Sequence, residues 1–453
     1  MQDRKAGGLV ARLISLLIVG LSLLWVGLDS DQGIAVQAVG AAQPTTLPTT
    51  VPITDTPTVT TTQFLPLINN DYTPLATRIG FGATRYPISR YPDVRQLQAG
   101  WYVDWAVQSN PVQPAGTEHA QLVNVHQKLA CGEFVNGDRA ACPYVQPLTY
   151  VYQPDQTTIE AAARTNPGQL WFIGNEMDRI DWLYCAEFEP DGRTCKSGKL
   201  RSGGQNEIVP ETYAQAYHDL YAIIKTADPT ARVAIGGVIQ ATPLRLQYLT
   251  LAWNAYQTQY GVDMPVDVWN VHNFILREQK NGYGAAIPPG LPGDPTVGAY
   301  VGNDCTHVDQ TVFDQQIRAM RQWMKERGQQ EKPLVVNEYG ILFAHTPFAP
   351  NNDGGKCKIN FNDETVVHTF MLWTFDYFLN NKDCSLGYTA DECRLVQRWL
   401  WFSLDHLEQD ANGNSLAGFN QHTSLFNGTT LQMRKAGELF KQFVVEHLSE
   451  LHQ

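Results

Sequence analysis

Short apolar segments alternate with longer segments of helical spacing along most of this chain, and this pattern constrains the fold more than any other feature. The apolar segments, each predicted to be a strand, are 78–81, 101–107, 121–126, 169–174, 232–239, 266–272, 333–337 and 398–404. The segments with helical character are 92–98 (a helix start), 156–165, 210–226, 244–260, 308–328, 364–380 and 433–448. Apolar strands separated by helices indicate a parallel sheet that is covered on both sides.

The number of predicted strands narrows this α/β class. Eight strands without a Gly-x-Gly-x-x-Gly turn favour a single closed (β/α)8 barrel over a doubly wound nucleotide-binding sheet. Another α/β fold is the alternative. In such a barrel the functional side chains gather at the carboxyl-terminal ends of the strands. Long loops are predicted at that face, over 178–206, 277–304 and 342–361, and we expect them to form the walls of a cleft.

The first 72 residues differ in composition from the rest. Basic residues precede an uncharged apolar run, 13–28, and small residues follow it. This order predicts a secretory signal peptide over 1–42, with an uncleaved signal anchor as the alternative. Residues 43–72 are rich in Thr and Pro and are predicted to be an extended linker. We therefore expect one exported folded domain, 73–453.

The cysteine content fits an oxidising compartment. The chain has eight cysteines, an even number, which in an exported protein favours disulfides. The expected pairs, each pinning a loop, are Cys131–Cys142, Cys185–Cys195, Cys384–Cys393 and, from the two that remain, Cys305–Cys357. Other connectivities stay open. A metal cluster is the alternative, but the sequence contains no Cys-x-x-Cys.

The charge and aromatic content bear on possible partners. Acidic residues outnumber basic ones, 45 against 33, and give a formal charge of −12. Such a surface repels phosphate backbones, so no nucleic-acid partner is expected. The 11 Trp, 19 Tyr and 18 Phe offer flat apolar faces of the kind that stack on sugar rings.

Two glutamates stand immediately beyond predicted strands. Glu176 follows the fourth strand, and Glu338 follows the seventh. One such glutamate alone is more typical of a loop cap or an Arg partner. Two on the same rim of a barrel indicate a general acid and a nucleophile for splitting a glycosidic bond. We expect about 5 Å between the two carboxylates, the separation typical of retaining enzymes.

These motifs resemble a known group of enzymes. Asn-Glu after the fourth strand and Glu after the seventh are similar to the signature of clan A, the large clan of retaining (β/α)8 (TIM barrel) glycoside hydrolases, and the resemblance spans 78–448. The aromatic-rich second strand and the Gly-Asn-Glu triplet resemble the subgroup of fungal cell-wall glycosyl hydrolases and endo-β-1,3-glucanases. The resemblance implies that Glu176 is the general acid/base, that Glu338 is the nucleophile, and that Asn175 hydrogen-bonds the substrate's 2-hydroxyl.

The resemblance assigns expectations to other strand ends as well. His272 closes the sixth strand and is expected to position the nucleophile, a core histidine being the alternative. Trp401 in the eighth strand is expected to lie under the sugar at the cleavage point, with Trp399 as its competitor on the same face. Tyr339 is a candidate for substrate contact, expected either to orient the nucleophile or to fill the rim. Trp105 is a further candidate for sugar contact.

The sequence departs from the clan's pattern at two places. Many members have an Arg at the end of the second strand, beside the nucleophile, but here that strand ends without one. Arg78 on the first strand is the provisional replacement. Many members have Pro after the acid/base, whereas this chain has Met177-Asp178. These departures concern the exact family more than the chemistry.

The expected function is a secreted retaining glycoside hydrolase that cleaves β-glycosidic bonds of a polysaccharide or oligosaccharide, more within chains than at their ends. The alternative is a non-catalytic carbohydrate-binding protein of the cell surface. A metal-dependent barrel hydrolase is disfavoured because neither His-x-His nor His-Glu-x-x-His occurs. We expect no cofactor, a monomer, a carbohydrate partner, and membrane contact only through an uncleaved N-terminal anchor.

Overall fold

The computed structural model divides the chain into two units, Met1–Ile68 and Asn69–Gln453. The residues that the structure describes all lie in the second unit; they are 76–84, 86–131, 139–180, 183–185, 200–202, 204–280, 284–302, 304–342, 359–405 and 420–452. The predicted signal peptide and linker, 1–42 and 43–72, lie outside these residues and remain predictions.

The eight predicted strands all contain strand structure in the described residues, although most are shorter than expected. The main strands are β1 (Ala76–Gly82), β2 (Ala99–Val103), β3 (Glu118–His119), β4 (Gln121–Gln127), β6 (Leu170–Ile173), β9 (Arg232–Ile235), β10 (Trp269–His272), β11 (Leu334–Glu338) and β12 (Arg398–Trp401). β3 was not predicted, nor were three further short strands, β5 (Tyr150–Gln153), β7 (Leu183–Cys185) and β8 (Leu200–Ser202).

The main strands pair in parallel and form two sheets. One sheet has the order β10-β11-β12-β1-β2-β3, and the other has the order β5-β4-β6-β9. Only β5 is antiparallel in these two sheets, where it pairs with β4. A single residue, Ala120, separates β3 from β4. Isolated parallel bridges, Ala234–Val268 and Val238–Val271, connect the segments around β9 and β10. The predicted parallel α/β architecture is thus confirmed.

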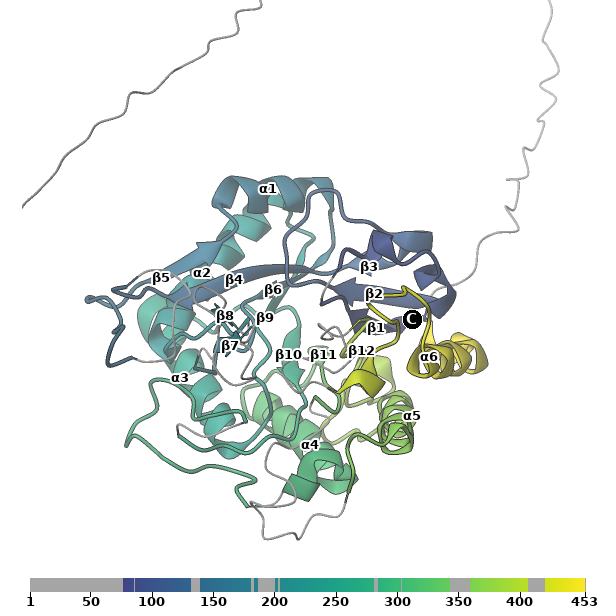
Figure 1. Ribbon diagram of the computed structural model, residues 1–453. Helices are drawn as coiled ribbons and strands as arrows, with labels where there is room; N and C mark the ends of the chain where they lie inside the picture. Colours follow the sequence, from purple (N-terminus) through teal and green to yellow (C-terminus); the bar gives the residue numbers. More distant parts are fainter. Residues whose placement is uncertain are drawn as a thin grey trace, which may run out of the picture. The chain divides into compact units, whose positions relative to one another are not determined.

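Helices follow most of the strands and surround them in Figure 1. They are α1 (Gln156–Thr165), α2 (Pro210–Ala227), α3 (Pro243–Tyr260), α4 (Gln310–Glu326), α5 (Glu364–Asn380), α6 (Lys435–Glu446) and α7 (Leu448–Leu451). Asp155, Asp309 and Asp363 cap α1, α4 and α5 by accepting from backbone N–H groups of the first turn. The predicted helix start at 92–98 is only a short 3-10 turn, Val94–Leu97.

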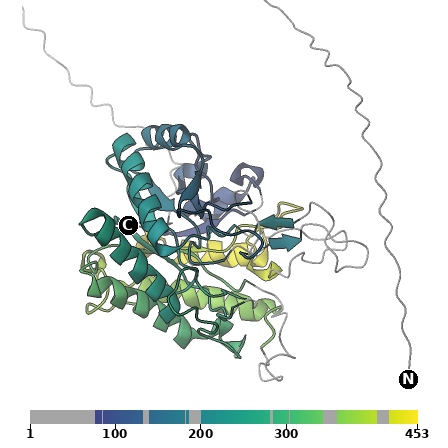
Figure 2. The same ribbon diagram turned by 90° about the vertical axis from the view of Figure 1, so that its left-hand side faces the viewer.

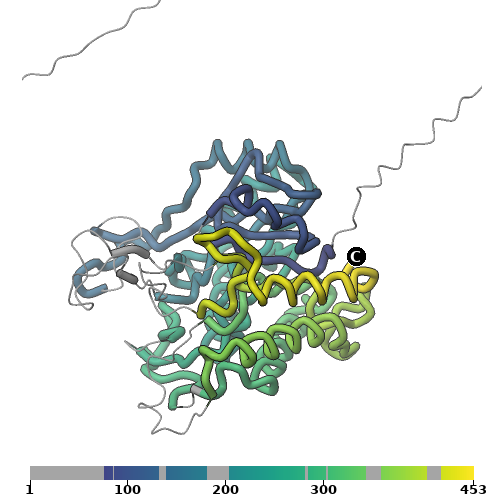
Figure 3. Tube along the Cα trace, turned by 45° about the vertical axis from the view of Figure 1, so that its right-hand side comes forward, coloured from purple at the N-terminus to yellow at the C-terminus, as the bar shows by residue number. Residues whose placement is uncertain are grey.

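The two faces of the strands bury different sets of side chains. Alternate residues of most strands, such as Leu122, Phe172, Val335 and Leu400, form one cluster. The residues between them pack against the helices in a second, larger cluster. Burial of both faces explains why the strands are apolar throughout. The C-terminal helices, yellow in Figure 3, lie beside the start of β1, and Thr77 Oγ1 donates to the Leu451 carbonyl at 3.3 Å.

Two of the expected disulfides, Cys131–Cys142 and Cys384–Cys393, are present. The first lies beyond the end of β4, as expected for a loop at the carboxyl-terminal face. The second lies between α5 and β12, in a connection outside the long loops predicted at that face. A segment that leads into a strand lies at the strand's amino-terminal end. The pairings with Cys195 and Cys357 involve residues outside the described ranges.

The antiparallel pair β7–β8 stands apart from the helices in the turned view of Figure 2. It belongs to the long connection that follows β6. None of the helices in the described part of the chain combines the length and apolar character needed to cross a bilayer.

Candidate active site

Glu176 is placed by a tight change of backbone direction after β6. Gly174 has a φ of 92° and Glu176 a φ of 47°, both in the left-handed region. A residue other than glycine rarely adopts this backbone conformation unless its surroundings hold it there. Residues in this conformation cluster at functional sites. The Glu176 N–H donates to the Gly237 carbonyl at 3.0 Å, which ties the turn to the segment after β9. The side chain is buried, at 3% exposure.

Glu338 is placed by an irregularity at the end of β11. Val271 pairs with Val336, but the next partners are His272 and Glu338, so Asn337 is an additional residue on β11. An extra residue of this kind re-aims the side chains that follow it. Strict alternation would send Glu338 to the helix side, because Val336 packs there. The irregularity instead lets Glu338 share the side of Asn337 and His272.

His272 lies between the two glutamates. Its Nδ1 is 3.3 Å from Glu176 Oε1 and 3.7 Å from Glu338 Oε2. The ring is fully buried, and it packs directly on Gly237. A Cβ at Gly237 would stand 2.2 Å from the imidazole Cδ2 and 2.9 Å from Asn337 Oδ1. Glycine is therefore required at this position for the imidazole to reach both carboxylates.

The two carboxylates meet, as the sequence predicted. Ligand atoms of Glu176, His272 and Glu338 all lie within 4.8 Å of one another. The spacing matches the roughly 5 Å of retaining glycosidases rather than the 6.5–9.5 Å of inverting ones. Such a triplet has the ligand types for a divalent metal ion. In the described part of the chain, however, Glu176 already pairs with a cation of its own.

That cation is Arg179, three residues further on. Arg179 Nη1 is 2.8 Å from Glu176 Oε2, and its Nη2 donates to the Gly284 carbonyl at 2.9 Å. Gln205 Nε2 also donates to Glu176 Oε2, at 3.1 Å. Together with His272, three side chains hold the Glu176 carboxylate in place.

Trp105 connects the neighbours of both glutamates. Its indole N–H donates to Asn175 Oδ1 at 3.2 Å and also reaches the carboxylate of Glu338. Asn175 in turn donates from Nδ2 to the Gly204 carbonyl at 3.0 Å. The structure thus places Asn175 and Trp105 in the site, as expected for contacts to a sugar.

The charges in the site are distributed unevenly. Burial alone would raise the pKa of Glu176, but Arg179 and His272 outweigh burial and lower it to about 2. Burial raises the pKa of Glu338 to about 7, with the negative charge of Glu176 adding to the effect and His272 opposing it. Burial acts to lower the pKa of His272, but the two carboxylates raise it overall. Glu176 therefore has stronger support for a negative charge than Glu338.

A buried ion cluster supports the turn that carries Glu176. Arg245 pairs with Asp178 at 2.9 Å and with Glu278 at 3.0 Å, and all three side chains are fully buried. Arg245 Nη2 also donates to the carbonyls of Ala285 and Ala286 at 2.5 and 2.7 Å. The cluster joins the loop after β6, helix α3 and the loop after β10. These are the segments that surround Glu176.

Two of the expected substrate contacts are wrong. Trp401 is fully buried on the helix side, where it packs edge-on against Tyr339 and Phe375. Its indole N–H donates to the Thr423 carbonyl at 2.7 Å. Tyr339 is also fully buried, and its hydroxyl lies 3.3 Å from Thr374 Oγ1. Trp399, the competitor of Trp401, faces the same way and stacks on Phe378.

Phe402 occupies the place that was assigned to Trp401. It is one residue further on and therefore faces the opposite side. Phe402 packs edge-on against Trp105 and Phe274, with ring centroids 5.8 and 6.2 Å apart. This small apolar cluster also contains Ile239. It gives the site an aromatic lining of the kind that suits a sugar face.

The provisional role of Arg78 is wrong as well. Arg78 is buried and pairs with Asp391 through both terminal nitrogens, at 2.8 and 2.6 Å. Asp391 precedes β12, so this pair lies at the amino-terminal end of the strands, away from Glu338. The hydrogen-bond donor to Glu338 is instead Trp105, and His272 lies 3.7 Å away as a neighbouring charge.

Sequence reasoning missed Arg179, Gln205 and Phe402. Arg179 was visible as a cation three residues after a catalytic candidate, a spacing that brings two side chains together in one turn. Phe402 was visible from the two-residue period of the eighth strand, in which the tryptophans share one face. Gln205 gave no local signal, because a long connection separates it from β6.

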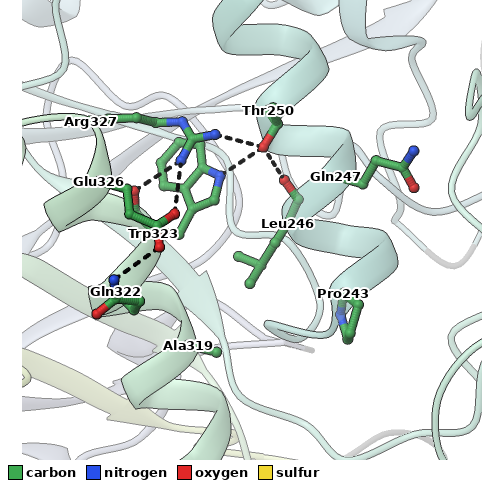
Figure 4. A pocket seen from close by; sticks show the side chains of 9 residues that line it. All are labelled: Pro243, Leu246, Gln247, Thr250, Ala319, Gln322, Trp323, Glu326 and Arg327. Atoms are coloured by element: carbon green, nitrogen blue, oxygen red, sulfur yellow. Dashed lines mark hydrogen bonds and ion pairs between the residues drawn. The ribbon is translucent and has the colours of Figure 1, made fainter.

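A separate hollow of about 480 Å³ lies on the outer surface between α3 and α4 (Figure 4). Trp323 and Arg327 form its inner wall, and Thr250 Oγ1 accepts from both, at 3.0 and 2.8 Å. Leu246 and Pro243 line its other side. None of these residues belongs to the carboxylate site.

Comparisons with known proteins give remote likenesses. No family model matches the chain, and no curated protein matches its sequence. The fold is similar to a GH128 (subgroup VII) oligosaccharide-binding protein from Trichoderma gamsii, with 13% identity, 82% of this chain and 95% of that chain covered, and a TM-score of 0.38. It is similar to xylanase 10B from Thermotoga petrophila RKU-1, with 10% identity, 82% and 94% covered, and a TM-score of 0.37.

A third likeness is to a GH128 (subgroup IV) endo-β-1,3-glucanase from Lentinula edodes, with 10% identity, 81% and 99% covered, and a TM-score of 0.39. These likenesses are too distant to assign an activity, so the function of this chain is inferred from its own site. The solved structures to which this fold is similar include glycoside hydrolases.

Proposed function

We propose that this chain is an exported retaining glycoside hydrolase that cleaves β-glycosidic bonds within polysaccharides or oligosaccharides. The observation that carries the proposal is the approach of Glu176 and Glu338 to within 4.8 Å, with His272 between them. Export is inferred from the sequence of residues 1–42 and fits the disulfides Cys131–Cys142 and Cys384–Cys393.

We further infer that the two sheets close into one (β/α)8 barrel. The strand pairings support this, because the last strand, β12, pairs with the first, β1, within one sheet. Where the two sheets meet, only Ala120 separates β3 from β4, and parallel bridges connect the segments around β9 and β10. In a closed barrel the ends of β6, β10 and β11 would surround one site.

The chemistry follows a double displacement. Glu176 protonates the leaving-group oxygen while Glu338 attacks the anomeric carbon, which forms a covalent glycosyl-enzyme. Glu176 then acts as the base that removes a proton from the incoming water, and the sugar is released with its original anomeric configuration. Asn175 hydrogen-bonds the 2-hydroxyl, and Trp105 with Phe402 contacts the sugar face.

One observation favours a second candidate, a carbohydrate-binding protein without catalysis. Glu176 is bound to Arg179, and a carboxylate held in an ion pair is a poor proton donor. Sugar binding alone, however, does not explain why Glu338 lies close to a second carboxylate, because that carboxylate disfavours the ionisation of Glu338.

The test is hydrolysis of a panel of β-1,3-, β-1,4- and mannose-based polymers by the full chain and its variants. Glu176→Gln and Glu338→Gln are each expected to lower kcat by about 100-fold or more, with sugar binding retained. Glu118→Gln is the matched control, because Glu118 binds Arg232 and Arg398 at the start of β3, away from the pair. Full activity of both pair variants would remove the proposal, and binding without any turnover in the wild type would favour the second candidate.

A further inference from the structure

The ion pair between Arg179 and Glu176 is built into the backbone rather than formed by chance. The Arg179 N–H donates to the Glu176 carbonyl at 3.0 Å, so the two residues close one turn. The Arg179 side chain is 8% exposed, and the Gly284 carbonyl accepts a hydrogen bond from its second terminal nitrogen at 2.9 Å. A buried arginine fixed at both ends keeps its charge directed at the same carboxylate oxygen.

Glu338 has weaker support for a negative charge. Among the described residues, its side-chain neighbours with a hydrogen to donate are the Trp105 indole and His272, whose Nδ1 is 3.7 Å away. His272 stands 3.3 Å from Glu176 and therefore favours that carboxylate. Two carboxylates this close do not ionise together readily, so the one with the better donors loses its proton first.

The other charged groups around the pair do not reverse this asymmetry. Asp178, beside Glu176, adds negative charge, but Arg245 neutralises it across 2.9 Å. Arg245 also binds Glu278, at 3.0 Å. Gln205 contributes an uncharged donor to Glu176. Arg179 is thus the only arginine or lysine that directly contacts either carboxylate among the described residues.

We propose that Arg179 is a positioning residue that holds Glu176 unprotonated in the substrate-free site, so that the proton shared by the pair rests on Glu338. The consequence for turnover depends on the proposed function. As the acid of the first step, Glu176 must receive this proton, so Arg179 has to loosen its hold on Glu176 when the substrate binds. As the base of the second step, Glu176 is already in the ionised form that this contact maintains, although the contact also weakens it as a proton acceptor.

The electrostatics of the site agree with this asymmetry: burial acts to raise the pKa of both glutamates, but Arg179 and His272 lower that of Glu176, whereas that of Glu338 stays raised. Without Arg179, burial would raise the pKa of Glu176 as it raises that of Glu338. The shared proton would then be free to move to Glu176, which still has His272 as a neighbour.

The direct test is a carboxyl ¹³C NMR titration of the substrate-free protein labelled at glutamate Cδ, with signals assigned by Glu176→Gln and Glu338→Gln. In the wild type the member of the pair that titrates near neutral pH is expected to be Glu338. In Arg179→Gln, Glu176 is expected to take up a proton in that range, whereas Arg179→Lys is expected to retain the wild-type order. Arg139→Gln is the matched control, because it removes an Arg–Glu pair, with Glu207, that does not contact Glu176 or Glu338.

Either of two results would overturn the proposal: Glu338 ionised well below neutral pH in the wild type, or Glu176 still unprotonated at neutral pH in Arg179→Gln. The first result is measured on the wild-type protein alone, so the test remains valid even when the Arg179→Gln variant does not fold. The titration needs no substrate, so it stands even where the Glu→Gln variants disprove hydrolysis.

Kinetics give a second readout that a purely structural role would not produce. The kcat/KM of Arg179→Gln relative to wild type is expected to rise about tenfold between pH 6 and pH 9, because the acid stays protonated to higher pH. A uniform loss at every pH would instead assign Arg179 to structure alone.

Discussion

The uneven support of the two glutamates predicts opposite effects on stability for the same substitution at two neighbouring positions. Burial raises the pKa of Glu338 from its ordinary value of 4.5 to about 7. In the unfolded chain this carboxyl ionises at ordinary pH, so between these values the folded state binds more protons than the unfolded state. Stability contributed by the protonated form is therefore lost as pH rises through 7.

The Glu338→Gln variant does not lose this stability, because its side chain does not ionise. Each unit of pKa difference corresponds to about 1.4 kcal/mol, so the variant is expected to exceed the wild type by about 3 kcal/mol in free energy of unfolding at alkaline pH. Near the ordinary pKa both side chains are neutral, and the difference is expected to vanish. The assay is urea unfolding of both proteins at several pH values between about 4 and 9.

Glu176→Gln supplies the matched comparison. The pKa of Glu176 is lowered to about 2, so its ionised form stabilises the fold above the ordinary pKa, and this contribution is lost as pH falls through 2. The variant is therefore expected to be less stable than the wild type at neutral pH, by about 3 kcal/mol. A destabilised Glu338→Gln at pH 9, or a difference between it and the wild type that does not vary with pH, would refute the reasoning.

Three further predictions follow from contacts of named residues. Gly237→Ala is expected to displace His272 and to cost about 1–3 kcal/mol in a thermal-unfolding assay, with kcat lowered; an unchanged kcat would contradict the placement of the imidazole. Phe402→Ala is expected to raise KM for the sugar, whereas Trp401→Phe should lower stability and leave KM unchanged; the reverse pattern in steady-state kinetics would restore the sequence-based assignment. Arg245→Met is expected to destabilise the fold by about 3–5 kcal/mol in urea, because it leaves two buried carboxylates without a cation; a loss below about 1 kcal/mol would show that the cluster is not charged.

Much of the fold could be predicted because its signals are local. The parallel α/β architecture and helices such as α1 and α5 follow from hydrophobic spacing, and the strand ends pointed to Glu176 and Glu338. The pair Cys384–Cys393 was predicted correctly from its short spacing, which does not tell at which end of the strands it lies. Spacing identifies partners along the chain, whereas the face depends on whether a loop leaves a strand or enters one.

The wrong predictions at the site arise where a shift of one residue along a strand changes whether a side chain faces the site or the helices. Trp401 and Tyr339 were expected at the substrate, but both face the helices. The irregularity at Asn337 turns Glu338 to the side of His272, and nothing in the local sequence signals such an extra residue. Arg179 could be seen in the sequence, but its ion pair depends on the left-handed conformation of Glu176 and on the loop at Gly284.

The measurement that bears most directly on the catalytic pair is covalent trapping with a 2-deoxy-2-fluoro glycoside of the sugar that the substrate panel identifies. Mass spectrometry of the digested protein should find one attached sugar, on the peptide that contains Glu338, and none in Glu338→Gln. A label on Glu176 would reverse the two roles. A hydrolytically active protein that forms no adduct, or one labelled at any other residue, would contradict the retaining mechanism assigned to this site.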